Sequence, residues 1–283
     1  MEMLSRRLPK NREAEELEAL YDRYNHRCFV HPDPIEFLYR FERPKDREIV
    51  GLIASCLAYG KVAQILRSIS LVLDKMGPSP ARFLLASKYE GLQCAFQGFK
   101  HRFTRGVDLA RLLWRAKTVI EDYGSLQACF VANFRAEDDT VIPALERFAE
   151  VFSPEGSPFL IPAPSKGSAC KRLNLFLRWM ARQDEVDPGG WNLVPPSKLV
   201  VPLDTHMHRT GLALGFTGRK QADLRTAFEI TDAFRKVAPH DPVKYDFVLT
   251  RLGIWSARKG LPEKPALRKE TGDENFCDRR LHL

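Results

Sequence analysis

Two residues capable of covalent chemistry stand at the starts of predicted helices. Asp204 follows a short apolar run in VVPLDTHMHRTG, where it can accept the unpaired backbone amides of the first helical turn and stay ionised. Lys171 lies in the first turn of an apolar helix beside Arg172, and both the helix N-terminus and the neighbouring cation disfavour a protonated amine. A neutral lysine amine is a nucleophile. A simple helix cap and a solvated basic pair are the alternative interpretations.

His206 and His208 form an H-x-H pattern after the same apolar run. Two such histidines could be ligands of a metal-dependent hydrolase. Sites of that kind need further His and Asp ligands on other strands, and this sequence predicts helices instead. We therefore favour a helix-surface or substrate-contact role and expect no metal.

The charge of the chain favours a polyanionic partner without requiring one. The 44 Lys and Arg residues exceed the 36 Asp and Glu residues, and the formal net charge of +8 makes nucleic acid one candidate. Trp191, in the loop DPGGWNLVPP, could stack on a base or pack the loop down, and packing is the simpler interpretation. Basic clusters that could contact phosphates or form solvated faces lie at 6–12, 100–105, 219–220 and 258–259.

The elements that must position these side chains follow a helical pattern almost throughout. A hydrophobic content of 44% over 283 residues is enough for a sizeable core. No internal repeat or strand pair is evident, so the sequence predicts an all-α fold. Apolar residues recur three and four positions apart, which predicts helices at 13–24, 35–41, 47–59, 61–76, 80–87, 106–123, 125–134, 140–152, 169–183, 204–215, 221–237 and 242–254.

The cysteines and the apolar runs give an expectation for cellular location. The six cysteines are scattered without a C-x-x-C pair, and we interpret them as reduced thiols. The N-terminal segment lacks the apolar core of a signal peptide, and no stretch approaches the roughly 18 apolar residues of a membrane span. We therefore expect a cytoplasmic protein with no membrane partner.

The segments around the two candidate catalytic residues resemble a known enzyme family. VVPLDTHMHRTGLALG is similar to the aspartate-bearing segment of the helix-hairpin-helix base-excision DNA glycosylases. Upstream, GSACKRLNLFLRWMAR occupies the place of that family's second hairpin helix, where bifunctional members carry a lysine nucleophile. The resemblance implies that Lys171 and Asp204 are the catalytic pair.

The resemblance extends over roughly residues 35 to 260, because EIVGLIASCLAYGKVAQILRSI, GVDLARLLWRAKTVIEDYG and PVKYDFVLTRLGI match further family helices in the same order. The closest pattern is an uncharacterised bacterial family whose nearest enzyme is the archaeal 8-oxoguanine DNA glycosylase type. Asp246 matches a base-pocket aspartate of that type. The sequence departs from the family at PAPSKGSAC, where Gly167 replaces a Gly-x-Gly turn, and in the 33-residue interval between Lys171 and Asp204. It also lacks the four-cysteine iron–sulfur loop, so we expect no cofactor.

The resemblance implies two helical lobes with a helix-hairpin-helix glycosylase-like core and a cleft between them. N-terminal helices at 1–45 would pack with a C-terminal helical lobe at 211–260. The core at 46–210 would carry the hairpin and the catalytic pair, and a charged tail would follow at 261–283. The expected substrate contacts are Asp246, His206, Trp191 and Leu203, and the expected DNA contacts are Lys166, Gly167, Ser168, Arg172 and Arg209.

The function implied by the resemblance is that of a bifunctional DNA glycosylase and abasic-site lyase of base excision repair. It would remove an oxidised purine such as 8-oxoguanine by attack of Lys171 on the anomeric carbon. The partner would be double-stranded DNA with a damaged base, bound by a cytoplasmic, nucleoid-associated monomer. The alternatives are a non-catalytic nucleic-acid-binding protein on the same fold and, less favoured, a metal-dependent hydrolase. The sequence leaves the preferred lesion open because specificity depends on pocket shape.

Overall fold

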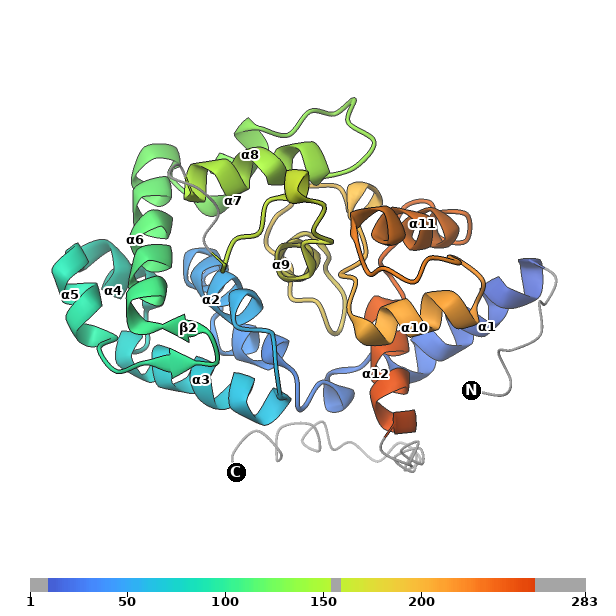
Figure 1. The fold of residues 1–283 in the computed structure, drawn as a ribbon, viewed down its shortest axis with the longest axis horizontal. Coiled ribbons are helices and arrows are strands. Elements are labelled where there is room, and N and C mark those ends of the chain that lie inside the picture. The colour runs from blue at the N-terminus through green and yellow to red at the C-terminus, as the bar shows by residue number, and fades with distance from the viewer. Residues whose placement is uncertain (1–9, 154–158, 258–283) are drawn as a thin grey trace.

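The computed structural model describes residues 10–153 and 159–257, and this part of the chain is built from helices (Figure 1). Its strands are Lys100–His101 (β1) and Thr104–Arg105 (β2), which pair as one short antiparallel hairpin. The prediction of an all-α fold is confirmed. The predicted tail at 261–283, the basic cluster at 258–259 and the start of the cluster at 6–12 lie outside the described residues.

The predicted helices occur within four residues of their expected bounds, except that segment 35–41 is a 3-10 helix. Here Asp33 accepts the backbone N–H of Ile35 at 3.1 Å and Pro34 occupies the first turn. The 3-10 helices are η2 (Arg27–Phe29), η3 (Pro34–Arg40), η4 (Pro164–Lys166) and η5 (Pro196–Lys198). The α-helices are α1 (Lys10–Tyr24), α2 (Pro44–Cys56), α3 (Val62–Met76), α4 (Pro80–Ala86), α5 (Tyr89–Ala95), α6 (Gly106–Tyr123), α7 (Leu126–Ala132), α8 (Ile142–Phe152), α9 (Lys171–Ala181), α10 (Thr205–Ala213), α11 (Leu224–Arg235) and α12 (Asp246–Ala257).

Helix α5 and the β hairpin were not predicted from the sequence. Helix α5 buries only Leu92, so its seven residues show no apolar period. The hairpin is held by tertiary contacts: the ring of the buried His101 bonds to the Ser68 hydroxyl at 2.9 Å and to the Tyr59 carbonyl at 3.1 Å. Such contacts leave no periodic signal in the sequence.

Helix α9 lies in the middle of the molecule and is seen end-on in Figure 1. In this view α2 to α6 lie to the left of it, with α3 at the bottom, while α7 and α8 lie above it and α1, α10, α11 and α12 lie to its right. Helix α2 packs directly on α9, because a Cβ atom at Gly51 would stand only 3.2 Å from the Phe176 ring. The helix that begins with Lys171 is therefore held by the core of the molecule.

The long connection between α9 and α10 is anchored by Trp191. The Trp191 side chain is 1% exposed and lies between the rings of Phe130 and Phe176, with centroid distances of 5.7 and 5.0 Å. Its indole N–H donates to Glu48 Oε1 at 2.7 Å. The expectation that Trp191 contacts substrate is therefore corrected: its ring faces are covered by the core, and it packs the loop down.

Helix α1 packs against the C-terminal helices. Glu18 accepts hydrogen bonds from Lys244 Nζ and from the Tyr245 hydroxyl, each at 2.6 Å. Tyr21, one turn later, contacts the Tyr245 ring edge-on. Across the described ranges, no helix has the length and apolar character needed to cross a membrane.

Candidate active site

Lys171 and Asp204 come together although they are 33 positions apart in the chain. Lys171 is the first residue of α9, and Asp204 caps α10. One carboxylate oxygen of Asp204, Oδ1, accepts the backbone N–H groups of His206 and Met207, each at 2.8 Å. The other, Oδ2, lies 3.7 Å from Lys171 Nζ. The predicted cap is confirmed, and it leaves one oxygen facing the amine.

The pair remains accessible from outside the core. The Lys171 side chain is 34% exposed and that of Asp204 is 20% exposed. The Lys171 amine also donates to the carbonyl of Ala58, at 3.4 Å, in the connection between α2 and α3. Three separate segments therefore position one amine and one carboxylate at the surface of a hollow.

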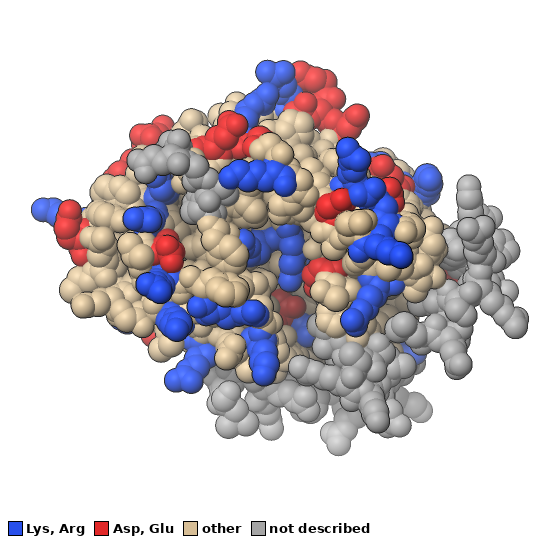
Figure 2. Space-filling view, in the orientation of Figure 1, with Lys and Arg blue, Asp and Glu red and all other residues tan. Residues whose placement is uncertain are grey.

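Two adjoining cavities meet at this pair. An inner cavity of about 360 Å³ is the more enclosed, and an outer groove of about 550 Å³ opens to solvent. Both are lined by the same five residues, Ala58, Gly60, Lys171, Asp204 and His206. Figure 2 shows the molecular surface hollowed near its centre, with Lys and Arg side chains on both sides of the hollow. A ligand could thus extend from the groove past the pair into the inner cavity.

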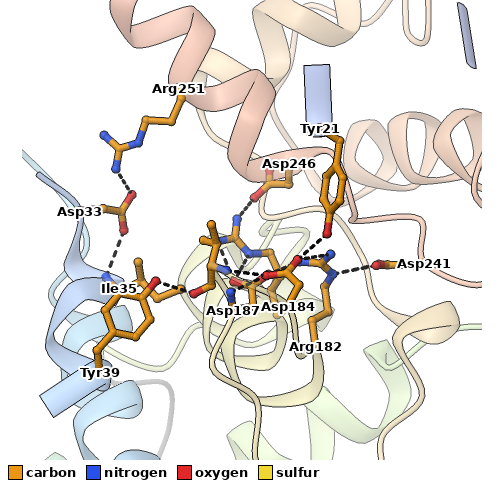
Figure 3. Close-up of polar contacts among 12 residues, drawn as sticks. Tyr21, Asp33, Ile35, Tyr39, Arg182, Asp184, Asp187, Asp241, Asp246 and Arg251 are labelled. Atoms are coloured by element: carbon orange, nitrogen blue, oxygen red, sulfur yellow. Dashed lines mark hydrogen bonds and ion pairs between the residues drawn. The ribbon is translucent and has the colours of Figure 1, made fainter. Parts of the chain in front are cut away.

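Two residues that line the inner cavity each carry a fully buried polar atom without a hydrogen-bond partner among the described residues. These atoms are Oδ1 of Asp246 and the indole Nε1 of Trp179. Burial raises the pKa of Asp246 to about 6, although the neighbouring Arg178 guanidinium acts to lower it (Figure 3). Buried polar groups are normally paired, so these two atoms are exceptions in the wall of the cavity.

Arg178 and Trp179 were missed from the sequence, whereas Asp246 was predicted. Arg178 and Trp179 follow Lys171 by seven and eight positions, which places them two turns further along the same face of α9. The position of Lys171 at the start of α9 therefore predicts which later residues of the helix line the same cavity. The apolar period of α9 also includes these two positions, so the sequence pattern alone predicts that they pack in the core.

The outer groove combines aromatic rings with an arginine. Arg172 lies over the rings of Tyr59 and Phe159, at 5.3 and 4.6 Å from their centroids, and both rings line the groove. Phe159 also contacts Phe103 at the tip of the β hairpin, and the two are 53% and 71% exposed. Exposed aromatic rings beside a cation are typical of surfaces that bind nucleic acid.

The predicted DNA contacts occupy different environments. Lys166 and Gly167 are exposed, and Ser168 lines the outer groove. Arg172 lines the groove. Its guanidinium donates to the carbonyls of Cys56 and Phe159, and these hydrogen bonds stabilise the wall of the groove. Arg209 is exposed on α10 and lines neither cavity.

The segment before α9 differs from a regular two-helix hairpin. The short helix η4 ends at Lys166, and Gly167 follows with a φ of +75°, which glycine adopts without strain. The Gly167 carbonyl accepts the backbone N–H of Leu224 at 3.2 Å. The turn is thus held against the start of α11, and the preceding α-helix, α8, already ends at Phe152.

The two histidines and Leu203 separate by position. His206 lines both cavities, and Leu203 lines the outer groove. His208 instead bonds through Nε2 to the carbonyl of Arg219 at 2.8 Å. Within 10–153 and 159–257 no group of three or more His, Cys, Asp or Glu side chains could hold a metal ion. Of the two histidines, only His206 lines the same two cavities as Lys171 and Asp204.

The fold and site define an all-α protein with a lysine–aspartate pair where two cavities meet. Residues 33–255 match a family described as "Protein of unknown function (DUF2400)", and the chain belongs to this family. No curated protein and no solved structure matches the chain. The function must therefore be argued from the site.

Proposed function

We propose that the protein is a DNA glycosylase with abasic-site lyase activity, acting on double-stranded DNA that contains a damaged base. An oxidised purine such as 8-oxoguanine is the first candidate substrate. The observation that carries the proposal is the amine of Lys171, 3.7 Å from the Asp204 carboxylate where the inner cavity meets the outer groove. A base turned out of the duplex would enter the inner cavity, and its sugar would lie beside the pair.

In the proposed reaction the neutral amine of Lys171 attacks the anomeric carbon of the nucleotide. The glycosidic bond breaks, and the base leaves with its electron pair and takes up a proton. Positive charge develops on the sugar, and Asp204 Oδ2 is the oxygen available to stabilise it because Oδ1 caps α10. The attached nitrogen then loses a proton, the C1′–O4′ bond of the sugar breaks and O4′ takes up a proton, which leaves a protonated Schiff base at C1′. This Schiff base acidifies C2′, and loss of a C2′ proton allows β-elimination to expel the 3′ phosphate.

The polar lining of the inner cavity supports a base as the ligand. It includes Asp33, His206 and Thr250, whose side chains carry hydrogen-bond donors and acceptors. Every nucleobase presents both donors and acceptors on its edges, and enzymes that flip a base read them in a pocket. The polar groups of the cavity and the edge of a flipped base are therefore complementary in kind.

The outer groove supports DNA as the larger partner. Tyr59, Phe159 and Phe103 offer ring faces for stacking, and Lys166 stands exposed near the groove. Lys and Arg side chains flank the hollow in Figure 2. Positive charge around a groove attracts the phosphate backbone.

The test is base release and strand nicking by the purified protein on duplexes carrying 8-oxoguanine or an abasic site. Lys171→Gln is expected to lose nicking on both duplexes, because glutamine cannot form a Schiff base. Asp204→Asn keeps a side chain that can cap α10 and is expected to slow base release by about 100-fold. Protein treated with a metal chelator is expected to remain active.

Two results would count against the proposal. Nicking by Lys171→Gln at the wild-type rate would exclude the lysine as nucleophile. Tight duplex binding without base release or nicking by the wild type would favour the alternative of a non-catalytic nucleic-acid-binding protein.

A further inference from the structure

Two exposed aromatic rings lie side by side at the edge of the outer groove. The Phe103 side chain, at the tip of the β hairpin, is 71% exposed, and that of Phe159, which lines the groove, is 53% exposed. Their ring centroids are 6.0 Å apart, although the two residues come from different segments of the chain. A contiguous apolar patch on a protein surface commonly marks a binding site.

Both rings are held in place by contacts with the rest of the groove. The Arg172 guanidinium lies 4.6 Å from the centroid of the Phe159 ring and donates a hydrogen bond to the Phe159 carbonyl. The hairpin that carries Phe103 is anchored by Tyr59, whose hydroxyl donates to the His101 carbonyl at 2.8 Å. Because the rings are already positioned, a ligand that binds them pays little entropy to order this surface.

The arrangement of the rings suits bases that are not paired. Phe103 and Phe159 meet edge to face, with an interplanar angle of 79°, so each ring keeps at least one face that the other does not cover. In a duplex every internal base is covered on both faces by its neighbours, so these rings cannot stack on it. Unpaired bases offer an open face, and proteins bind single strands by stacking them on aromatic side chains.

The charge of this surface is complementary to a phosphate backbone. Arg102, also at the hairpin tip, is exposed and extends over the groove-lining Gly60, where a Cβ atom would stand only 2.7 Å from Arg102 Cδ. Arg172 donates to carbonyls, which do not neutralise its charge. Asp204, the acidic residue of the groove lining, faces the amine of Lys171. The groove and its edge therefore attract phosphates.

We propose that the outer groove is a binding site for a single strand of DNA, whose unpaired bases stack on Phe103 and Phe159 while Arg102 and Arg172 attract its phosphates. This inference deepens the proposed function and rests on it for the choice of DNA over RNA. The preferred substrate is then a damaged base beside an unpaired stretch, such as a bubble in a duplex. The damaged base enters the inner cavity, and its unpaired neighbours stack on the rings of the groove.

The binding test uses unmodified DNA, so that it does not depend on catalysis. Fluorescence anisotropy with the full chain compares a labelled strand of about 12 nucleotides, the same strand annealed to its complement, and RNA of the same sequence, all at one salt concentration. Phosphate attraction alone favours the duplex, which has the higher charge density. We expect the single DNA strand to bind at least about fivefold more tightly than the duplex, because only its bases can stack on the rings.

Substitutions of the two rings separate stacking from apolar contact. Phe103→Ala and Phe159→Ala are each expected to weaken single-strand binding by about 5- to 100-fold, which is the effect of losing one stacked base. Phe103→Leu keeps an apolar side chain without an aromatic face and is expected to lose as much, whereas Phe103→Trp is expected to bind as the wild type does. Leu193→Ala is the matched control, because Leu193 is 59% exposed and lines neither cavity, and its binding is expected to stay unchanged.

A second readout connects the groove to the proposed reaction. Single-turnover release of 8-oxoguanine is compared between a fully paired duplex and the same duplex with several mismatched pairs beside the lesion. Release is expected to be at least about fivefold faster from the mismatched duplex, and Phe103→Ala is expected to remove most of this difference.

The outcomes separate this inference from the proposed function. A wild type that releases no base and nicks no abasic site would contradict the glycosylase function, whereas single-strand binding that depends on Phe103 would still support the groove as a binding site. An active wild type that binds the duplex more tightly than the single strand, or single-strand binding unchanged in Phe103→Ala and Phe159→Ala, would overturn the inference alone. Full binding by Phe103→Leu would overturn stacking, and tighter binding of RNA than of DNA would overturn DNA as the occupant.

Discussion

At the scale of single residues, Asp204 serves two purposes with two different oxygens. Oδ1 caps helix α10 through the backbone N–H groups of His206 and Met207, and Oδ2 faces Lys171. The cap fixes the rotation of the carboxylate, so the structural role directs the oxygen that is proposed to act on the sugar. A residue that would ordinarily count as a helix cap can thus also be catalytic.

Substitution can separate these two purposes. Asp204→Ser keeps a capping oxygen and is expected to hold the free energy of unfolding close to the wild-type value, while base release is largely lost. Asp204→Ala is expected to lose about 1 kcal/mol of stability in addition. Urea unfolding and single-turnover base release measure the two effects. Equal stability of the serine and alanine variants would mean that the cap contributes nothing.

Trp179 lines the inner cavity and is expected to shape the space that the base would occupy. Trp179→Phe leaves a smaller ring there, and we expect base release to slow by about tenfold with abasic nicking little changed. The ratio of the two rates is the measurement. A parallel decline in both reactions would indicate a packing defect instead.

At the level of elements, apolar periodicity predicted helix α9, but it identified only some of the residues of α9 that line the cavities. The start of the helix and its first residue, Lys171, followed from pattern and resemblance. Arg178 and Trp179 were not found, because in a buried helix the cavity-lining positions and the core positions share the same period. The carboxylates that pair with Arg178 come from other segments, and no local sequence pattern predicts such contacts.

The connection between α9 and α10 is anchored by Trp191. The sequence left base stacking and packing of the loop open for this residue, with packing the simpler interpretation, and Trp191 is buried with its indole N–H donating to Glu48 at 2.7 Å. Trp191→Phe leaves the buried Glu48 carboxylate with one donor fewer, and we expect a loss of about 1–3 kcal/mol in the free energy of unfolding. Denaturant titration measures this loss. An unchanged midpoint would contradict the anchoring role of Trp191.

At the scale of the whole molecule, α9 lies between two groups of helices with the cavities opening beside its first turn (Figure 1). The resemblance anticipated the meeting of Lys171 and Asp204, and the helical pattern anticipated the all-α fold. The sequence could not show the division into an inner cavity and an outer groove, because it arises from tertiary packing. The lobes, the monomeric state and the nucleoid association stay predictions.

The net charge of +8 gives a prediction for the whole surface. Duplex binding is expected to weaken as salt rises, and Lys166→Ala is expected to reduce the slope of log K against log salt by about one phosphate contact. Arg82→Ala, an exposed site on α4 that lines neither cavity, serves as the control. Fluorescence anisotropy over a salt series measures both slopes, and equal slopes would remove Lys166 from the DNA-binding surface.

Borohydride trapping of the protein on duplexes with 8-oxoguanine or an abasic site tests directly whether Lys171 is the nucleophile. Reduction of a Schiff base leaves the protein covalently joined to DNA, and peptide mapping then identifies the joined residue. We expect an adduct at Lys171 that is absent in Lys171→Gln. An adduct at another residue, or none on either duplex despite tight binding, would contradict it.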